Sequence, residues 1–306
     1  VSPEGRLAAT QLGIWEDSQI DGLRDLAAII HQSGAIAGIQ IHHAGRKATL
    51  EHTYGEAPLV PSLTDRSPEG ARAMSEEDIG RVMDAFVAAT HRAALAGFDY
   101  VELHGAHGYL MSQFLSPNTN RRADRWGGSL SNRMRFILET YRRCVARANG
   151  RLVVSIRLGL ADGRPGGITP DDGLAVAREL AALGCPVIHV SHGGGRPEEV
   201  VPEGSPFSAY MHLAGMVKSE VPVAVIGVGG VFTPQQAEAV LEKGMADLVA
   251  VGRGILADPQ WAVKALEGRA EDIELCVDCK PRCYHFKEAE KCPARKRLAE
   301  RARGQA

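Results

Sequence analysis

The sequence lacks a long apolar run, an excess of charge of either sign and a signal peptide. No apolar stretch approaches the roughly 20 residues that a membrane-spanning helix needs, and the first residues lack the charged and apolar regions of a secretory leader. Lys plus Arg number 35 against 37 Asp plus Glu, a net charge of −2, and the basic residues are scattered until the last stretch. These absences argue against a membrane or nucleic acid as partner, and the expected location is the cytoplasm.

Cysteine is also scarce over most of the chain. Only Cys144 and Cys185 precede residue 276, one in a helical pattern and one at the start of a strand, where cysteine acts as a small hydrophobe. A chain of 306 residues that is 44% hydrophobic and 24% charged can bury a sizeable core. Without a linker or an internal repeat, one domain is expected over residues 1–270, followed by a segment over 271–306 rich in Cys, Lys, Arg and Glu.

From residue 16 onward, helix and strand patterns alternate with short connections, which indicates βαβ units and a parallel sheet. Ser75 with Asp78 has capping-box spacing, and Thr-Pro pairs at 169–170 and 233–234 each place a cap before a first-turn proline. Six strands alone do not separate an open sheet from a closed barrel. The expected strands are 35–43, 98–105, 152–160, 186–192, 222–230 and 246–252, with helices over 17–34, 75–97, 132–150, 169–184 and 233–244.

Loops at the carboxyl ends of such strands usually carry the functional site. Glycine-bearing turns at 227–230 and 252–254 follow the last two expected strands, and Arg253 adds a positive charge. Backbone N–H groups of two adjacent turns can bind one phosphate, although glycine at a strand end also serves ordinary turns. The other strand ends are 40–46, 104–109, Arg157 and 191–195.

His104, His107 and Tyr109 end one of these strands together. Imidazole N–H groups can donate to a substrate oxygen, and a phenol can lend a proton. A metal site would need at least a third ligand, for which Glu102, His42 and His43 are candidates. An ordinary hydrogen-bonded turn is the remaining alternative, and the spacing by itself does not choose between them.

Arg157 lies inside the apolar segment "SIRLGL". A buried charge is costly unless it is paired, so an anionic or electron-rich partner is expected. A structural salt bridge with a core carboxylate is the alternative.

Several segments resemble a known family. "HGAHGYLMSQFLSPNTNRRADRWGGSLSNRMRF" is similar to the fingerprint of the Old Yellow Enzyme family of FMN-dependent NAD(P)H:flavin oxidoreductases. "LGIWEDSQIDGL" and "IQIHHAGRKA" resemble its thermophilic-type ene-reductase branch, and the similarity extends to about residue 270. The resemblance implies a TIM (β/α)8 barrel with FMN at the carboxyl ends of its strands. Because "VSPEGR" follows the second strand in that family, the first two strands and the first helix are expected to be absent here.

The resemblance also implies an activity, in which hydride passes from NAD(P)H through the flavin to an activated C=C bond of an α,β-unsaturated carbonyl or enoyl thioester. The partner is then a small unsaturated molecule, and a homo-oligomer is left open. An inactive barrel remnant that serves as a binding or interaction module is the competing hypothesis. The implied roles are a clamp on the substrate oxygen for His104 and His107, proton donation for Tyr109, flavin contacts for Gln40 and Arg157, and phosphate binding for Gly229, Gly230, Gly252 and Arg253.

The segment "CVDCKPRCYHFKEAEKC" gathers the remaining cysteines. It resembles the iron–sulfur segment of the 2,4-dienoyl-CoA reductase and trimethylamine dehydrogenase branch, in which the last gap is longer. Cysteines at such spacings in a cytosolic protein indicate a metal site rather than disulfides. A [4Fe–4S] cluster, a structural zinc with or without His285, and free thiols are the alternatives. The expected ligands are Cys276, Cys279, Cys283 and Cys292.

Overall fold

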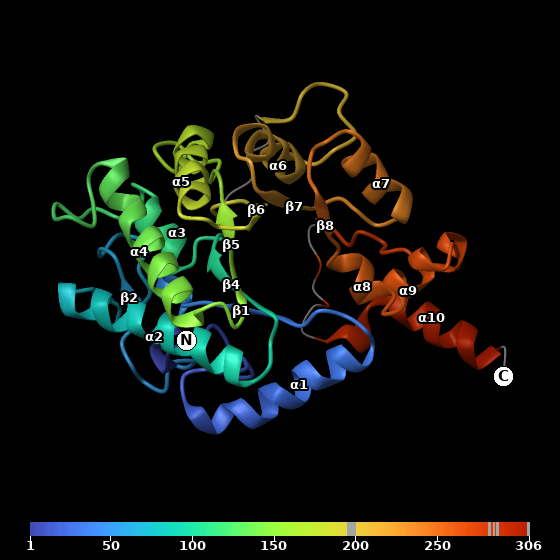
Figure 1. The fold of residues 1–306 in the computed structure, drawn as a ribbon, viewed down its shortest axis with the longest axis horizontal. Helices are drawn as coiled ribbons and strands as arrows, with labels where there is room; N and C mark the ends of the chain where they lie inside the picture. The colour runs from blue at the N-terminus through green and yellow to red at the C-terminus, as the bar shows by residue number, and fades with distance from the viewer. Residues whose placement is uncertain (195–199, 281–282, 284, 286–287, 305–306) are drawn as a thin grey trace.

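The computed structural model describes residues 1–194, 200–280, 283, 285 and 288–304. Gly195, at the end of one expected site loop, lies outside them. The main feature is a parallel sheet of six strands in the order β1-β4-β5-β6-β7-β8. Figure 1 shows the sheet curving from β1 round to β8, with helices along its outside. The strands are β1 (Gly38–Ile41), β4 (Tyr100–Gly105), β5 (Val153–Gly159), β6 (Val187–Ser191), β7 (Ala224–Val228) and β8 (Leu248–Ala250).

Helices connect these strands, as the alternating pattern predicted. A separate pair of two-residue strands, β2 (Leu59–Val60) and β3 (Arg72–Ala73), lies in the connection between β1 and the next helix. The helices are α1 (Ile20–Gln32), α2 (Glu76–Leu95), α3 (Leu110–Leu115), α4 (Leu130–Ala148), α5 (Pro170–Ala182), α6 (Ala209–Glu220), α7 (Pro234–Glu242), α8 (Arg253–Ala257), α9 (Trp261–Leu266) and α10 (Pro293–Gly304).

The three expected helix caps are confirmed. The Ser75 hydroxyl accepts from the backbone N–H of Asp78 at 3.1 Å, at the start of α2. Thr169 and Thr233 cap α5 and α7 in the same way, each at 3.2 Å. These side chains satisfy backbone donors that the first helical turn leaves unpaired.

Among the described residues, five helices have no counterpart in the sequence prediction: α3, α6, α8, α9 and α10. All six residues of α3 are buried, so no polar face produces a helical period. Helix α6 also lacked a recognised pattern. Helix α4 begins at Leu130, two residues before the expected start, because the Ser129 side chain accepts from the N–H of Asn132 and caps the earlier position.

Strand register gives the sheet two different faces. Side chains such as Val101, Leu103 and Ile156 are fully buried within the hydrophobic core, to which the helices contribute. The opposite face carries polar side chains in register. His104 pairs with Arg157, and Arg157 with His189 on the next strand. Because neighbours in a parallel sheet project to the same side, the fold brings these polar groups together.

The Cys-rich segment folds back on α8. Cys292 and Ala294 pack against Ala257. The buried carboxylate of Glu274 accepts from Arg297 at 2.6 Å and lies 3.1 Å from Arg301, both on α10. Within the described residues, none of the helices has the length and apolar character required to cross a bilayer.

Candidate active site

The two predicted histidines form a directed hydrogen-bond chain. The backbone N–H of Ala106 donates to His104 Nδ1 at 3.2 Å, so that nitrogen is an acceptor and Nε2 carries the proton. His104 Nε2 then donates to His107 Nδ1 at 3.1 Å. His107 Nε2 donates in turn to the hydroxyl of Ser191, at 2.8 Å. The chain therefore runs from the end of β4 to the end of β6.

Both imidazoles are held in the neutral form. Burial, with the Arg157 charge, lowers the pKa of His107 to about 2. Burial and the neighbouring His107 hold the pKa of His104 well below its usual range. At neutral pH each ring is thus uncharged and carries one N–H, which can donate a hydrogen bond to a developing negative charge.

The backbone at His107 has an uncommon conformation. Its φ of 58° lies in the left-handed region, where a non-glycine residue costs energy. Gly108 follows with a φ of 70°. The His107 N–H donates to the carbonyl of His192 at 2.8 Å and fixes this turn. The turn aims the ring at Ser191.

Tyr109 is packed beside this chain. Its ring stacks on His42 with centroids 4.8 Å apart and meets His104 edge-on at 4.7 Å. Lys47 Nζ lies 4.9 Å from the ring centroid. Burial raises the pKa of Tyr109, against a smaller opposite effect of Arg157, so the phenol keeps its proton at neutral pH. The packing fixes the ring while its hydroxyl has no hydrogen-bond partner among the described residues.

Glu102 organises the polar face of the sheet. Gln40 Nε2 donates to one carboxylate oxygen at 2.6 Å, and His189 Nδ1 lies 3.0 Å from the other. Burial would raise the pKa of this carboxyl, but the hydrogen bond and charge of His189 lower it overall. The expected flavin residue Gln40 is thus oriented by Glu102.

Arg157 carries a buried Nε that has no hydrogen-bond partner in the described part of the chain. Burial lowers its pKa, and the nearby Glu102 and Tyr109 act in the opposite direction. No ion pair involving Arg157 is found within the described residues, so the structural salt bridge considered above is not observed. An unsatisfied guanidinium N–H in this position suits an electron-rich ligand.

The two glycine turns lie next to each other. Gly229 and Gly230 have φ values of 102° and 78°, and a Cβ at Gly229 would lie 2.8 Å from a ring carbon of Tyr210. The Arg253 guanidinium lies 4.9 Å from the ring centroid of Phe232. This contact joins the loop after β7 to the loop after β8. These loops, with the unsatisfied Arg157, fit a phosphate-bearing isoalloxazine cofactor such as FMN.

Arg253 also has a partner that the sequence did not indicate. Its guanidinium forms an ion pair with Asp278, which lies between the first two cysteines of the tail. Asp278 has a left-handed φ of 46°. The expected phosphate residue is therefore linked to the Cys-rich segment.

The tail cysteines are all free thiols. Burial raises the pKa of the Cys276 thiol. Cys276 packs against the cluster formed by Ala257, Cys292 and Ala294. Across the residues that the structure describes, no group of three or more His, Cys, Asp or Glu is arranged to hold a metal ion. As placed, the thiols do not fit a closed metal site.

A site of polar side chains on one face and at the carboxyl ends of a curved parallel sheet defines an α/β-barrel type of enzyme. The chain belongs to the NADH:flavin oxidoreductase / NADH oxidase family, which matches residues 1–272.

Two curated relatives illustrate the similarity. The NADH oxidase of Thermoanaerobacter brockii is 41% identical over 285 residues, which are 92% of this chain but 44% of that protein. An NADPH dehydrogenase of Geobacillus sp. (strain WCH70) is 37% identical, over 90% of this chain and 79% of its own. The chain thus spans less than half of the first relative and most of the second.

Solved structures agree on the fold. A 2-naphthoyl-CoA reductase in complex with 2-naphthoyl-CoA superposes with a TM-score of 0.82 at 27% identity, over 93% of this chain and 46% of that one. The old yellow enzyme homologue from Zymomonas mobilis has a TM-score of 0.76 at 23% identity, over 95% of this chain and 83% of its own. The Old Yellow Enzyme resemblance and the barrel fold class are confirmed, with six barrel strands among the described residues.

Proposed function

We propose that this protein is an FMN-dependent oxidoreductase that reduces an activated C=C bond of a small unsaturated carbonyl or thioester compound with electrons from NAD(P)H. The observation that carries the proposal is the chain of neutral N–H donors at His104 and His107, set beside the protonated phenol of Tyr109. Such a site suits a reaction in which a substrate oxygen gains negative charge and a carbon gains a proton.

The residues that would hold FMN come from several strand ends. Gln40 and Arg157 would face its pyrimidine ring. When bound, FMN supplies the hydride that it takes from NAD(P)H. Its phosphate would be held by Gly229, Gly230, Gly252 and Arg253.

The histidine pair would bind the substrate oxygen through the His107 Nε2–H, because the His104 Nε2–H is donated to His107 Nδ1 and orients that ring. In this structure the His107 Nε2–H is satisfied by the Ser191 hydroxyl, at 2.8 Å. An oxygen that gains negative charge is a stronger acceptor than a neutral hydroxyl. The His107 N–H can therefore change its acceptor from the Ser191 hydroxyl to the substrate oxygen as the charge develops. This hydrogen bond stabilises the substrate most at that point.

The first test is cofactor uptake. The purified protein, incubated with FMN and freed of excess, is expected to retain visible flavin bands, which anaerobic NAD(P)H bleaches and an enone restores. Arg157→Gln should weaken FMN retention because it removes the guanidinium charge, whereas Arg142→Gln, an exposed position on α4, should not. Failure of the unmodified protein to take up FMN would instead support the barrel remnant acting as a binding module.

We also propose that residues 271–306 form an appended segment whose four cysteines bind a metal. Support comes from the spacing of the four cysteines in the sequence and from the packing of Cys276 against the cluster that contains Cys292. Because the thiols as placed do not form a ligand set, binding requires them to close together, and either a [4Fe–4S] cluster or zinc could drive this.

Metal analysis distinguishes the two. Anaerobically purified protein is expected to contain iron and acid-labile sulfide, with broad visible absorption that dithionite bleaches. Zinc in their place would identify a structural site. The variant Cys279→Ser should lose metal, whereas Cys185→Ser in the barrel should keep it. Absence of iron, sulfide and zinc from fresh protein would leave four free thiols and refute the metal proposal.

A further inference from the structure

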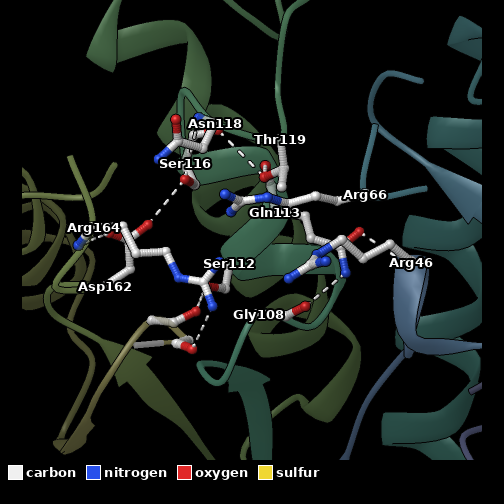
Figure 2. A pocket seen from close by; sticks show the side chains of 12 residues that line it. Arg46, Arg66, Gly108, Ser112, Gln113, Ser116, Asn118, Thr119, Asp162 and Arg164 are labelled. Carbon is white, nitrogen blue, oxygen red and sulfur yellow. Dashed lines mark hydrogen bonds between the residues drawn. The ribbon is translucent and has the colours of Figure 1, made fainter. Parts of the chain in front are cut away.

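A pocket beside the candidate active site gathers three arginines. Arg46 lies in the turn after β1, Arg66 in the loop between β2 and β3, and Arg164 in the loop after β5. Figure 2 shows their side chains reaching from three separate segments toward one space.

Among the described residues, no carboxylate forms an ion pair with any of these arginines. Burial lowers the pKa of Arg46, and the charges of Arg164 and Arg66 lower it further, which places the like charges close together. Arg46 Nε is buried without a hydrogen-bond partner in the described residues. Among those described residues, none of the three arginines forms an ion pair. By contrast, Arg72 is held by the carboxylate of Asp78.

One carboxylate, Asp162, also lines the pocket. It accepts from the Ser116 hydroxyl at 3.1 Å and from the backbone N–H of Arg164 at 3.2 Å, rather than from a guanidinium. Asp162 thus orders the loop that carries Arg164. The Arg164 guanidinium donates to the carbonyl of Gly194 at 3.3 Å, and no described carboxylate competes with a ligand for the three guanidinium groups.

A buried glutamine supports the pocket on its other side. Gln113, which is 1% exposed, accepts from the backbone N–H of Arg46 at 3.1 Å and donates to the carbonyl of Gly108 at 2.8 Å. The pocket wall is therefore fixed rather than formed by chance contacts of surface side chains.

The pocket borders the candidate active site directly. Gly108, one of its lining residues, stands between His107 and Tyr109. A Cβ at Gly108 would lie 3.8 Å from an Arg46 guanidinium nitrogen. A molecule held by His107 and Tyr109 could therefore place an attached group among the arginines. The cavity of about 20 Å³ admits only a small group.

We propose that Arg46, Arg66 and Arg164 form an oxyanion subsite, which binds a carboxylate or phosphate group of the molecule that docks at His107 and Tyr109. This proposal rests on the proposed function of that site. Guanidinium groups match planar oxyanions with paired hydrogen bonds. Two molecules could supply the anion: an unsaturated acid as substrate, or the phosphates of NAD(P)H.

Anion binding can be measured without catalysis. Fumarate and inorganic phosphate are each expected to raise the Tm of the FMN-treated protein, whereas dimethyl fumarate should raise it less. The double variant Arg46→Gln, Arg164→Gln should lose this protection, with affinity for the anion reduced by about tenfold or more. Arg142→Gln, which removes the same kind of charge from the outer helix α4, should behave as the unmodified protein.

The Tm without anion separates ligand binding from a structural role. Removing mutually repelling charges should leave that Tm unchanged or higher, whereas loss of a structural contact should lower it. Retained anion protection in the double variant, or none in the unmodified protein, would overturn the proposal. Because this measurement needs no turnover, a protein that binds anions but not FMN would refute only the proposed function.

Half-reactions identify the source of the anion. A substrate source predicts that the double variant loses its preference for an unsaturated acid over the methyl ester, with flavin reduction by NAD(P)H unchanged. A nucleotide source predicts weaker NAD(P)H binding and an unchanged preference. If neither half-reaction changes, the subsite does not serve the molecule at His107 and Tyr109, and the proposal fails.

Discussion

Replacement of both His104 and His107 by alanine is expected to slow reduction of an unsaturated substrate by about 10²-fold to 10³-fold, the usual effect of removing preorganised donors to a developing oxyanion. FMN retention and flavin reduction by NAD(P)H should be preserved, because neither ring is among the residues assigned to the cofactor. Rapid-mixing measurements of the two half-reactions would show the loss in the oxidative one.

His31→Ala is a suitable control for this experiment. His31 is an exposed histidine that pairs with Asp99, away from the strand ends that carry the site. Turnover in the control should match that of the unmodified protein. Unimpaired turnover in the double variant would contradict the clamp assignment. Release of a bound metal ion by His107→Ala would favour the metal-ligand alternative, which the sequence alone left open.

Tyr109→Phe should slow proton delivery to the substrate by about 10²-fold to 10⁴-fold, the range usual for a positioned general acid. The substitution keeps the ring that stacks on His42 at 4.8 Å, so it removes the hydroxyl and little else. Flavin reduction by NAD(P)H should change little, since it does not need this proton.

The control here is Tyr100→Phe, at the first residue of β4, the strand that leads to the turn carrying Tyr109. It removes a phenol from β4 without touching the carboxyl end, and both half-reactions should keep their rates. If Tyr109→Phe slowed the two half-reactions equally, Tyr109 would act on the general structure of the site and not as the proton donor.

Much of the fold could be predicted from the sequence because its signals are local. A capping side chain and the N–H that it satisfies lie three residues apart, so Ser75, Thr169 and Thr233 mark helix starts without knowledge of the rest of the molecule. The buried strands follow from continuous apolar runs. Local signals fail for α3, because a helix buried on all sides has no polar face to reveal the helical period.

The sequence also placed His104, His107 and Tyr109 at one strand end, since residues so close in the chain share a turn. The order in which the two imidazoles donate their hydrogen bonds was not predictable from the sequence. Ser191 appeared only as part of a strand end, yet its hydroxyl accepts the last hydrogen bond of the series, from His107, which lies 84 residues away in the sequence. His189 could have been found from the pattern of the buried strand, because it projects to the same side as Ser191, two residues on.

The sequence by itself therefore determined the strands, the capped helices, the strand ends and the residue types available there, because each depends on neighbours within a few positions. Tertiary structure alone decided which charges meet. It paired Arg253 with Asp278 of the Cys-rich segment, and it left Arg46, Arg66 and Arg164 facing one another without a carboxylate partner in the described residues. Electrostatic energy depends on distance in space, and only the pairing of strands distant in the sequence brings together the loops that set these distances.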